Sequence, residues 1–230
     1  MIVVNSVPVK IRAEDILQTL KVGTQKQQEA LLVIEKGFEM IKPRTVYTFA
    51  KVKEIEKTEV RLDVGRFIQS IILADLLELG QTVALFVATI GENLEQEASR
   101  KGKTSTLNAW VLEQTGDYAL GKASAYIKAR VEDTLEGNVS CFSPGSGTGR
   151  LFGIEQQKVL FEILDPLKNI GVNLSSSFLM VPRKSVSGIY AVTRQEYVAC
   201  QYCPRERCQN RKKPFGGEYF SLSCEHRTSA

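Results

Sequence analysis

Four cysteines near the C-terminus are the side chains of this sequence best suited to bind a metal. The Cys200-x-x-Cys203 spacing brings two thiolates within reach of one metal ion. Cys208 adds a third thiolate after a short loop, and Cys224 can return as a fourth. A thiolate quartet suits either tetrahedral zinc or an iron–sulfur cluster. The sequence therefore predicts a metal site made by these four side chains.

The spacing leaves the identity of the metal open. It matches neither the two close pairs of a zinc ribbon nor the cysteine run of a bacterial ferredoxin, and Pro204 directly after Cys203 favours iron–sulfur over zinc. Reduced free thiols are the simplest alternative, although free thiols gain nothing from a CxxC spacing. His226, the only histidine, could replace Cys224 as a ligand, but a solvated terminal histidine is the simpler interpretation.

Basic residues surround these cysteines. They can offset the negative charge of metal-bound thiolates, which is the interpretation we favour, or they can dock an acidic partner. The basic residues are Arg205, Arg207, Arg211, Lys212 and Lys213.

The second candidate site is a glycine-rich loop. Its sequence is Ser143-Pro144-Gly145-Ser146-Gly147-Thr148-Gly149. Without Cβ atoms, Gly145 and Gly147 let backbone amides approach a ligand closely. The loop lacks the Gly-Lys-Ser/Thr ending of a phosphate loop and the glycine spacing of a dinucleotide fingerprint. Turn chemistry alone would also produce such a loop at the surface.

Several function classes are disfavoured by what the chain contains. With 43% hydrophobic and 24% charged residues, the composition is that of a globular protein, and a net charge of +4 gives no case for a nucleic-acid binder. A single histidine is poor support for a serine hydrolase, and no HExxH or Walker motif occurs. Cys141 lies beside the glycine-rich loop without a visible base, which predicts a small buried residue rather than a nucleophile.

The chain is expected in the cytoplasm, without a membrane partner. The apolar start of residues 1–4 is brief, and Pro8 and Lys10 follow at once, unlike a signal peptide. The longest apolar stretch, residues 67–79, contains Asp75 and Glu78 and is too interrupted to span a bilayer. A reducing compartment also argues against disulfides.

Periodicity along the chain predicts a mixed α+β domain. The central element is the apolar, β-branched run at residues 83–90, which predicts a strand covered on both faces. Helices are predicted at 12–20, 25–40, 67–79, 92–100, 104–131 and 156–164. Strands are predicted at 46–55, 60–64, 83–90, 178–181 and 186–192, with a strand or extended arm at 2–4 and 7–11.

A succession of short motifs in the second half of the chain points to one family. In order, the motifs are Ser143-Pro144-Gly145, Gln156-Gln157, Gly171-Val172-Asn173, Met180-Val181-Pro182 and Ser185-Val186-Ser187-Gly188-Ile189-Tyr190. This succession resembles the reactivation (S-adenosylmethionine-binding) domain of cobalamin-dependent methionine synthase, over about residues 5–197. The last two motifs are the most specific.

The resemblance implies a fold and a set of ligands. The fold is a mixed, mainly antiparallel sheet with flanking helices over residues 1–198, followed by a cysteine-rich, metal-binding tail over 199–230. S-adenosylmethionine would be bound while a corrinoid in the inactive cob(II) state is reduced and remethylated. The implied contacts to this cofactor are Ser143, Pro144, Gly145, Gly147, Tyr190 and Tyr197. Three family positions differ here: an arginine is matched by Cys141, a tyrosine pair by Glu196-Tyr197, and an acidic residue falls near Gly121 or Ala125.

The sequence therefore predicts an accessory protein of corrinoid-dependent methyl transfer in methionine biosynthesis. Its partners would be a corrinoid-binding methyltransferase or corrinoid protein, which supplies the cobalamin, and an electron donor protein. Two alternatives remain: a noncatalytic S-adenosylmethionine-binding module with structural zinc, and a scaffold that has lost ligand binding. A complete synthase is not expected at 230 residues, and whether the chain is itself an enzyme is open.

Overall fold

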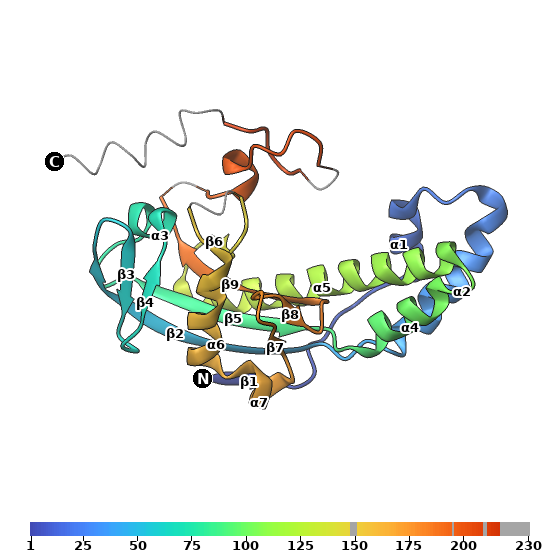
Figure 1. Ribbon diagram of the computed structural model, residues 1–230, viewed down its shortest axis with the longest axis horizontal. Coiled ribbons are helices and arrows are strands. Elements are labelled where there is room, and N and C mark those ends of the chain that lie inside the picture. Colours follow the sequence, from blue (N-terminus) through green and yellow to red (C-terminus); the bar gives the residue numbers. More distant parts are fainter. Residues whose placement is uncertain (148–150, 195, 209–210, 217–230) are drawn as a thin grey trace.

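A seven-stranded antiparallel sheet forms the centre of the computed structural model, which describes residues 1–147, 151–194, 196–208 and 211–216 (Figure 1). Six strands follow the order β4-β3-β2-β5-β9-β6, and β1 pairs with β2. Their bounds are β1 Ile2–Val4, β2 Arg44–Ile55, β3 Glu59–Leu62, β4 Phe67–Gln69, β5 Thr82–Thr89, β6 Val139–Phe142 and β9 Ser185–Val192. A separate pair joins β7 Asn173–Leu174 to β8 Met180–Val181. The predicted α+β class with an antiparallel sheet is confirmed.

Strand β5 is buried on both faces, as its β-branched run predicts. On one face Ala84 and Phe86 pack with Ile127 of the long helix α5 (Thr106–Leu135). On the other face Val83 and Leu85 belong to the largest core cluster. That cluster includes side chains of α3 (Ile71–Leu76), α6 (Gln157–Leu164) and α7 (Pro166–Ile170). The two faces of the sheet are therefore covered by different helices.

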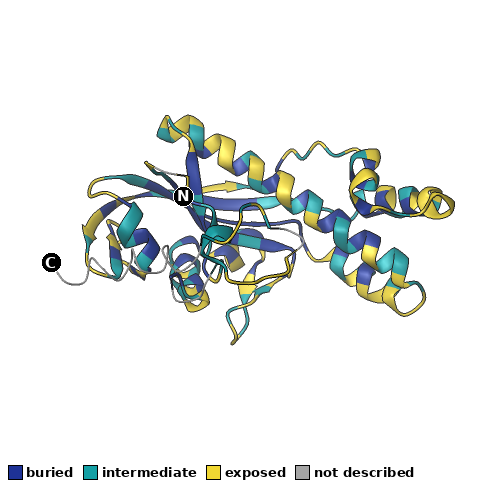
Figure 2. Cartoon of the chain, turned by 90° about the horizontal axis from the view of Figure 1, so that it is seen from above, coloured by how far each residue is buried: buried dark blue, intermediate teal, exposed yellow. Residues whose placement is uncertain are grey.

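Helix α5 extends beyond the sheet into a helical lobe (Figures 1 and 2). There it packs with α1 (Ala13–Leu20), α2 (Gln27–Phe38) and α4 (Asn93–Gly102). Three short 3-10 turns complete the described chain, η1 Thr24–Lys26, η2 Ile154–Gln156 and η3 Ala199–Tyr202. In the described part of the chain, no helix is long and apolar enough to cross a lipid bilayer.

The helix predicted over residues 67–79 is wrong at both ends, since α3 covers only Ile71–Leu76. Residues 67–69 form β4, where Ile68 pairs with Val60, and α3 begins only at Ile71. Ser70 separates the two elements, because its backbone is extended and its hydroxyl accepts the N–H of Leu73 as a helix N-cap. A short apolar run is ambiguous between strand and helix, and the capping serine decides where the helix starts.

Helix α5 runs without a break through two glycines, and only one of them is packed. A Cβ at Gly116 would lie 2.9 Å from Leu94 Cδ2 and 3.2 Å from Lys184 Cε, whereas a Cβ at Gly121 would meet nothing within 4 Å. Gly116 therefore allows α4 and the start of β9 to approach α5 closely.

We expect Gly116→Val to lower the free energy of unfolding by about 1–3 kcal/mol, because two added methyl groups would overpack this contact. The matched change Gly121→Val, on the open face of the same helix, is expected to shift it by less than about 0.5 kcal/mol. Urea unfolding followed by circular dichroism measures both. Equal losses in the two variants would contradict close packing at Gly116.

Candidate functional site

The predicted ligand-binding loop begins where β6 ends, at Phe142. Its glycines have left-handed backbones, with φ of 82° at Gly145 and 79° at Gly147. Gly145 donates its N–H to Phe152 O at 2.9 Å, and Ser146 donates to Ser143 O at 3.0 Å. Thr148 and Gly149 lie outside the described residues. The loop is thus shaped by its glycines, but two of its amides already bond within the protein.

Both glycines also lie against neighbouring segments. A Cβ at Gly145 would lie 3.2 Å from Ile154 Cβ, and a Cβ at Gly147 would lie 3.2 Å from Ala199 O. Ala199 opens the turn η3, so the start of the cysteine-rich tail packs directly against the glycine-rich loop. Whether 198/199 is a domain boundary stays a prediction.

The two tyrosines predicted at the site belong to different core clusters, on opposite faces of the sheet. Tyr190 stands opposite Cys141 in the β6–β9 pair and packs on the α5 side, with its ring stacked on Phe86 at 4.5 Å. Tyr197 packs on the other side, stacked on Phe142 at 4.5 Å. The structure therefore places Tyr190 near Cys141, and it places Tyr197 in the core beside the tail.

The Tyr190 hydroxyl is anchored rather than free. It donates to Ser124 O of α5 at 3.3 Å. Burial raises the pKa of Tyr190, with a smaller contribution from Cys141, so the phenol is protonated at neutral pH. Burial likewise raises the pKa of Cys141, whose Sγ lies 3.8 Å from Ser143 Oγ. Tyr190 and Cys141 therefore supply neutral polar groups next to Ser143, and Cys141 is not a thiolate nucleophile.

Tyr197 links β6 to the tail through a row of aromatic rings. Its ring lies between Phe142, at 4.5 Å, and Tyr202 of η3, at 5.3 Å. Its N–H donates to Ser140 Oγ at 2.9 Å. Burial raises the pKa of Tyr197, with a smaller contribution from the neighbouring Tyr202. This row fixes the first turn of the tail on the main domain.

Arg211 organises the described part of the tail. Its guanidinium donates to Cys200 O at 2.9 Å, to Cys203 O at 3.1 Å, and also to Arg205 O. The N–H of Lys212 donates to Cys200 Sγ at 3.3 Å. Backbone N–H donation, first from Lys212, lowers the pKa of the Cys200 thiol. The turn at Cys200 therefore favours a thiolate, as a metal ligand requires.

The predicted metal site is not assembled by the described residues alone. Among them, no three cysteine, histidine or acidic side chains lie together in a way that could hold a metal ion. Cys200 and Cys203 are partly buried, and Cys208 is exposed. Cys224 and His226 lie outside the described residues. The four-cysteine site therefore stays a prediction.

Sequence reasoning missed an ion-pair cluster that ties the residues just before β9 to α5. Lys184 is 8% exposed, and its Nζ lies 2.7 Å from Glu113 Oε2 and 2.6 Å from Asp117 Oδ1. Glu95 of α4 accepts the backbone N–H of Arg183 at 2.8 Å. Despite its own desolvation, Glu113 has a lowered pKa because Lys184 and Arg183 bind it. The two basic residues Arg183-Lys184, directly after the Met180-Val181-Pro182 motif, were the available hint.

Gly188, within the Ser-Val-Ser-Gly motif, is a second position whose importance emerges only from the structure. A Cβ there would lie 2.8 Å from Phe142 O and 3.0 Å from Ser143 Oγ. Gly188 thus allows β9 to approach the point where β6 leads into the glycine-rich loop.

Comparisons with known proteins bear on the fold and on the second half of the chain. Residues 128–213 match the family model of the vitamin B12 dependent methionine synthase, activation domain. Among solved structures, the crystal structure of the MetH reactivation domain bound to AdoHcy is similar with a TM-score of 0.60 and 13% identity, covering 84% of this chain and 81% of that chain. No curated protein matches. The matched stretch contains the glycine-rich loop, both tyrosines and the first three tail cysteines.

Proposed function

Because the chain has the fold of the methionine synthase reactivation domain, and residues 128–213 match the model of that family, we propose that it is an accessory protein for reductive reactivation of a corrinoid methyltransferase. It would bind S-adenosylmethionine, or the demethylated product AdoHcy, at the end of β6. A partner protein would supply the corrinoid, and an electron donor protein would reduce its cobalt before the sulfonium methyl group is transferred.

The glycine-rich loop is the observation that carries this proposal. Gly145 and Gly147 have positive φ angles and lie close to Ile154 and Ala199, so the described part of the loop is packed at the end of β6. Since the amides of Gly145 and Ser146 are already bonded, the contacts to ligand would come from the Ser143 hydroxyl and from carbonyl groups of the loop. Tyr190 and Tyr197 would position the loop through β9 and the tail.

Binding of S-adenosylmethionine and AdoHcy, measured by isothermal titration calorimetry, tests the ligand. We expect Gly145→Val to weaken binding at least tenfold, because a side chain there meets Ile154 and strains a left-handed backbone. Gly65→Val is the matched control, since Gly65 also has a positive φ, of 73°, but nothing within 4 Å. The absence of heat from either ligand with folded protein would remove this part of the proposal.

Reactivation itself is tested by mixing the protein with a cobalamin-dependent methyltransferase in the cob(II) state and a chemical reductant. We expect faster recovery of methylcobalamin absorbance when the protein and S-adenosylmethionine are both present. An unchanged rate, with ligand binding intact, would favour the noncatalytic S-adenosylmethionine-binding module instead.

The tail is proposed to bind iron–sulfur or zinc through Cys200, Cys203, Cys208 and Cys224, and the proposed reaction does not depend on it. The supporting observations are the N–H bond to Cys200 Sγ and the carbonyls held by Arg211. Bound metal would supply either an electron relay or a structural crosslink.

Iron, zinc and acid-labile sulfide, measured on protein purified without oxygen, decide between these metals. We expect Cys203→Ser to lower the bound metal by more than half while the main domain stays folded. Cys141→Ser, which alters a cysteine of β6, should leave the metal content unchanged. Protein with neither metal would leave free thiols as the better description.

A further inference from the structure

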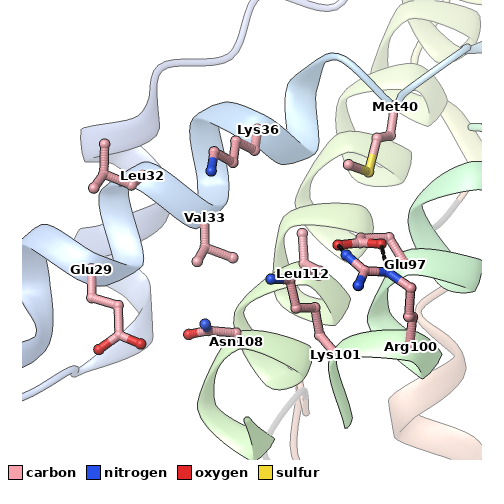
Figure 3. A pocket seen from close by; sticks show the side chains of 10 residues that line it. All are labelled: Glu29, Leu32, Val33, Lys36, Met40, Glu97, Arg100, Lys101, Asn108 and Leu112. Carbon is pink, nitrogen blue, oxygen red and sulfur yellow. Dashed lines mark hydrogen bonds and ion pairs between the residues drawn. The ribbon is translucent and has the colours of Figure 1, made fainter. Parts of the chain in front are cut away.

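The helical lobe contains a pocket that is distant from the glycine-rich loop (Figure 3). Its volume is about 380 Å³, within the roughly 300–1,000 Å³ of small-molecule sites. At 1.5 Å of rise per residue, Asn108 of this pocket and Ser124, which contacts Tyr190, are separated by about 24 Å along α5. The lining residues are Glu29, Leu32, Val33, Lys36, Met40, Glu97, Arg100, Lys101, Asn108 and Leu112.

The pocket lies beside a close contact between helices. A Cβ at Gly37 of α2 would lie 3.3 Å from Leu94 Cδ1 and 3.3 Å from Thr115 Cγ2, so α2 touches α4 and α5 closely there. In the preceding turns of α2, lining residues recur at three- and four-residue spacing and so share one face. They face one side of α4 and one side of α5, and the hollow lies between the three helices (Figure 3).

The floor of the helical-lobe pocket is apolar. Leu112 is 2% exposed and closes the bottom, and Val33 and Met40 are partly buried against the neighbouring core. Leu32 also lines the pocket and is 55% exposed. The pocket therefore offers aliphatic surface to a ligand that can cover it.

The charges around the pocket leave a positive excess. Glu97 is bound by two nitrogens of Arg100 at 2.6 Å, which lowers the pKa of Glu97. Glu29 pairs with Lys26 at 2.8 Å, and this bond lowers the pKa of Glu29. Both carboxylates thus have cationic partners.

Two lysines of the pocket, by contrast, make no direct ion pair, although Lys101 contributes to the lowered pKa of Glu97. No ion pair joins Lys36 or Lys101 to a carboxylate in the part of the chain that the structure describes. Figure 3 shows Lys36 on the α2 wall and Lys101 on the α4 wall. The charge left for a ligand is therefore positive and comes from both sides of the hollow.

We propose that this pocket binds a small amphipathic anion, a carboxylate carried on an aliphatic chain. The carboxylate lies between Lys36 and Lys101, and the chain covers Leu32, Val33 and Leu112. A charge-assisted contact at the mouth and an apolar floor together select such a ligand over a neutral or cationic one. The proposal does not rest on S-adenosylmethionine binding.

Decanoate is the probe, titrated calorimetrically into the full chain. We expect saturable binding of one decanoate per chain. The double variant Lys36→Glu/Lys101→Glu is expected to weaken it at least tenfold, because two attractive charges become repulsive. The control Lys53→Glu/Lys57→Glu reverses the same number of charges on exposed positions of the sheet region and should leave affinity within twofold.

Decanol and decyltrimethylammonium test whether charge selects the ligand, and each should bind at least tenfold more weakly than decanoate. Circular dichroism confirms folding, and Lys36→Gln/Lys101→Gln replaces the reversal if that variant unfolds. The proposal is overturned if decanoate shows no saturable binding, if both double variants behave alike, or if decanol binds as tightly. Failure of S-adenosylmethionine binding would leave these outcomes unaffected.

Discussion

Replacing Phe142 by alanine is expected to lower the free energy of unfolding by about 3–5 kcal/mol, the cost of emptying a fully buried phenylalanine site. Phe142 is 0% exposed, and its ring stacks on Tyr197 at 4.5 Å. The substitution removes both a core side chain and the first ring of the aromatic row that anchors the tail. Urea denaturation of the two proteins gives the difference.

Two further variants delimit this effect. Phe142→Leu keeps most of the volume and should cost less than half as much. Phe67→Ala removes a ring that is 46% exposed and lies 5.3 Å from the Arg61 guanidinium, and should cost less than about 1 kcal/mol. If Phe142→Ala cost no more than Phe67→Ala, Phe142 would not be the core residue described above.

The second large effect is expected at Gly188, where alanine should destabilise the fold by about 1–3 kcal/mol and also weaken ligand binding. The added Cβ would lie 2.8 Å from Phe142 O, which is backbone and cannot yield as a flexible side chain can. Either β6 separates from β9, or Ser143 moves with the loop. Both the unfolding energy and the affinity for S-adenosylmethionine should therefore fall together.

Gly23→Ala is the matched control. Gly23 has an ordinary φ of −59° and nothing within 4 Å of an added Cβ. Alanine there should be neutral or stabilise by up to about 1 kcal/mol, because it restricts the unfolded chain. A Gly188→Ala protein as stable as Gly23→Ala would mean that β6 and β9 are not held at this spacing.

Elements with strong periodicity could be predicted from the sequence. The apolar run at 83–90 predicted the buried central strand, and the helical periodicity of residues 104–131 predicted one long helix. Strand β6 could not be found, because four residues carry no readable period and its pairing partner β9 lies far along the chain. Tertiary pairing, rather than local sequence, determines that strand.

The candidate site was predictable as a set of motifs but not as a geometry. The glycine-rich loop was identified from its composition, and its positive φ angles agree with that. Tyr190 and Tyr197 lie on opposite faces of the sheet. The face of Tyr190 is set by the register of β9 against β6, and that of Tyr197 by the path of the backbone after Val192. Neither can be obtained from spacing, since a one-residue shift in register moves every side chain to the other face.

The order of strands also bears on how the chain reaches this fold. Strand β9 lies between β5 and β6, so Ala84 must pair with Tyr190, a residue more than a hundred positions later in the chain. Such distant pairing is slow to form and comes late during synthesis, when β5 has long been exposed as an unpaired edge. The stretch 128–213 lacks β2 and β5, so we expect that it does not fold by itself. A ribosome-bound chain ending before Ser185 should therefore aggregate or recruit a chaperone, whereas a chain that includes β9 can complete the sheet.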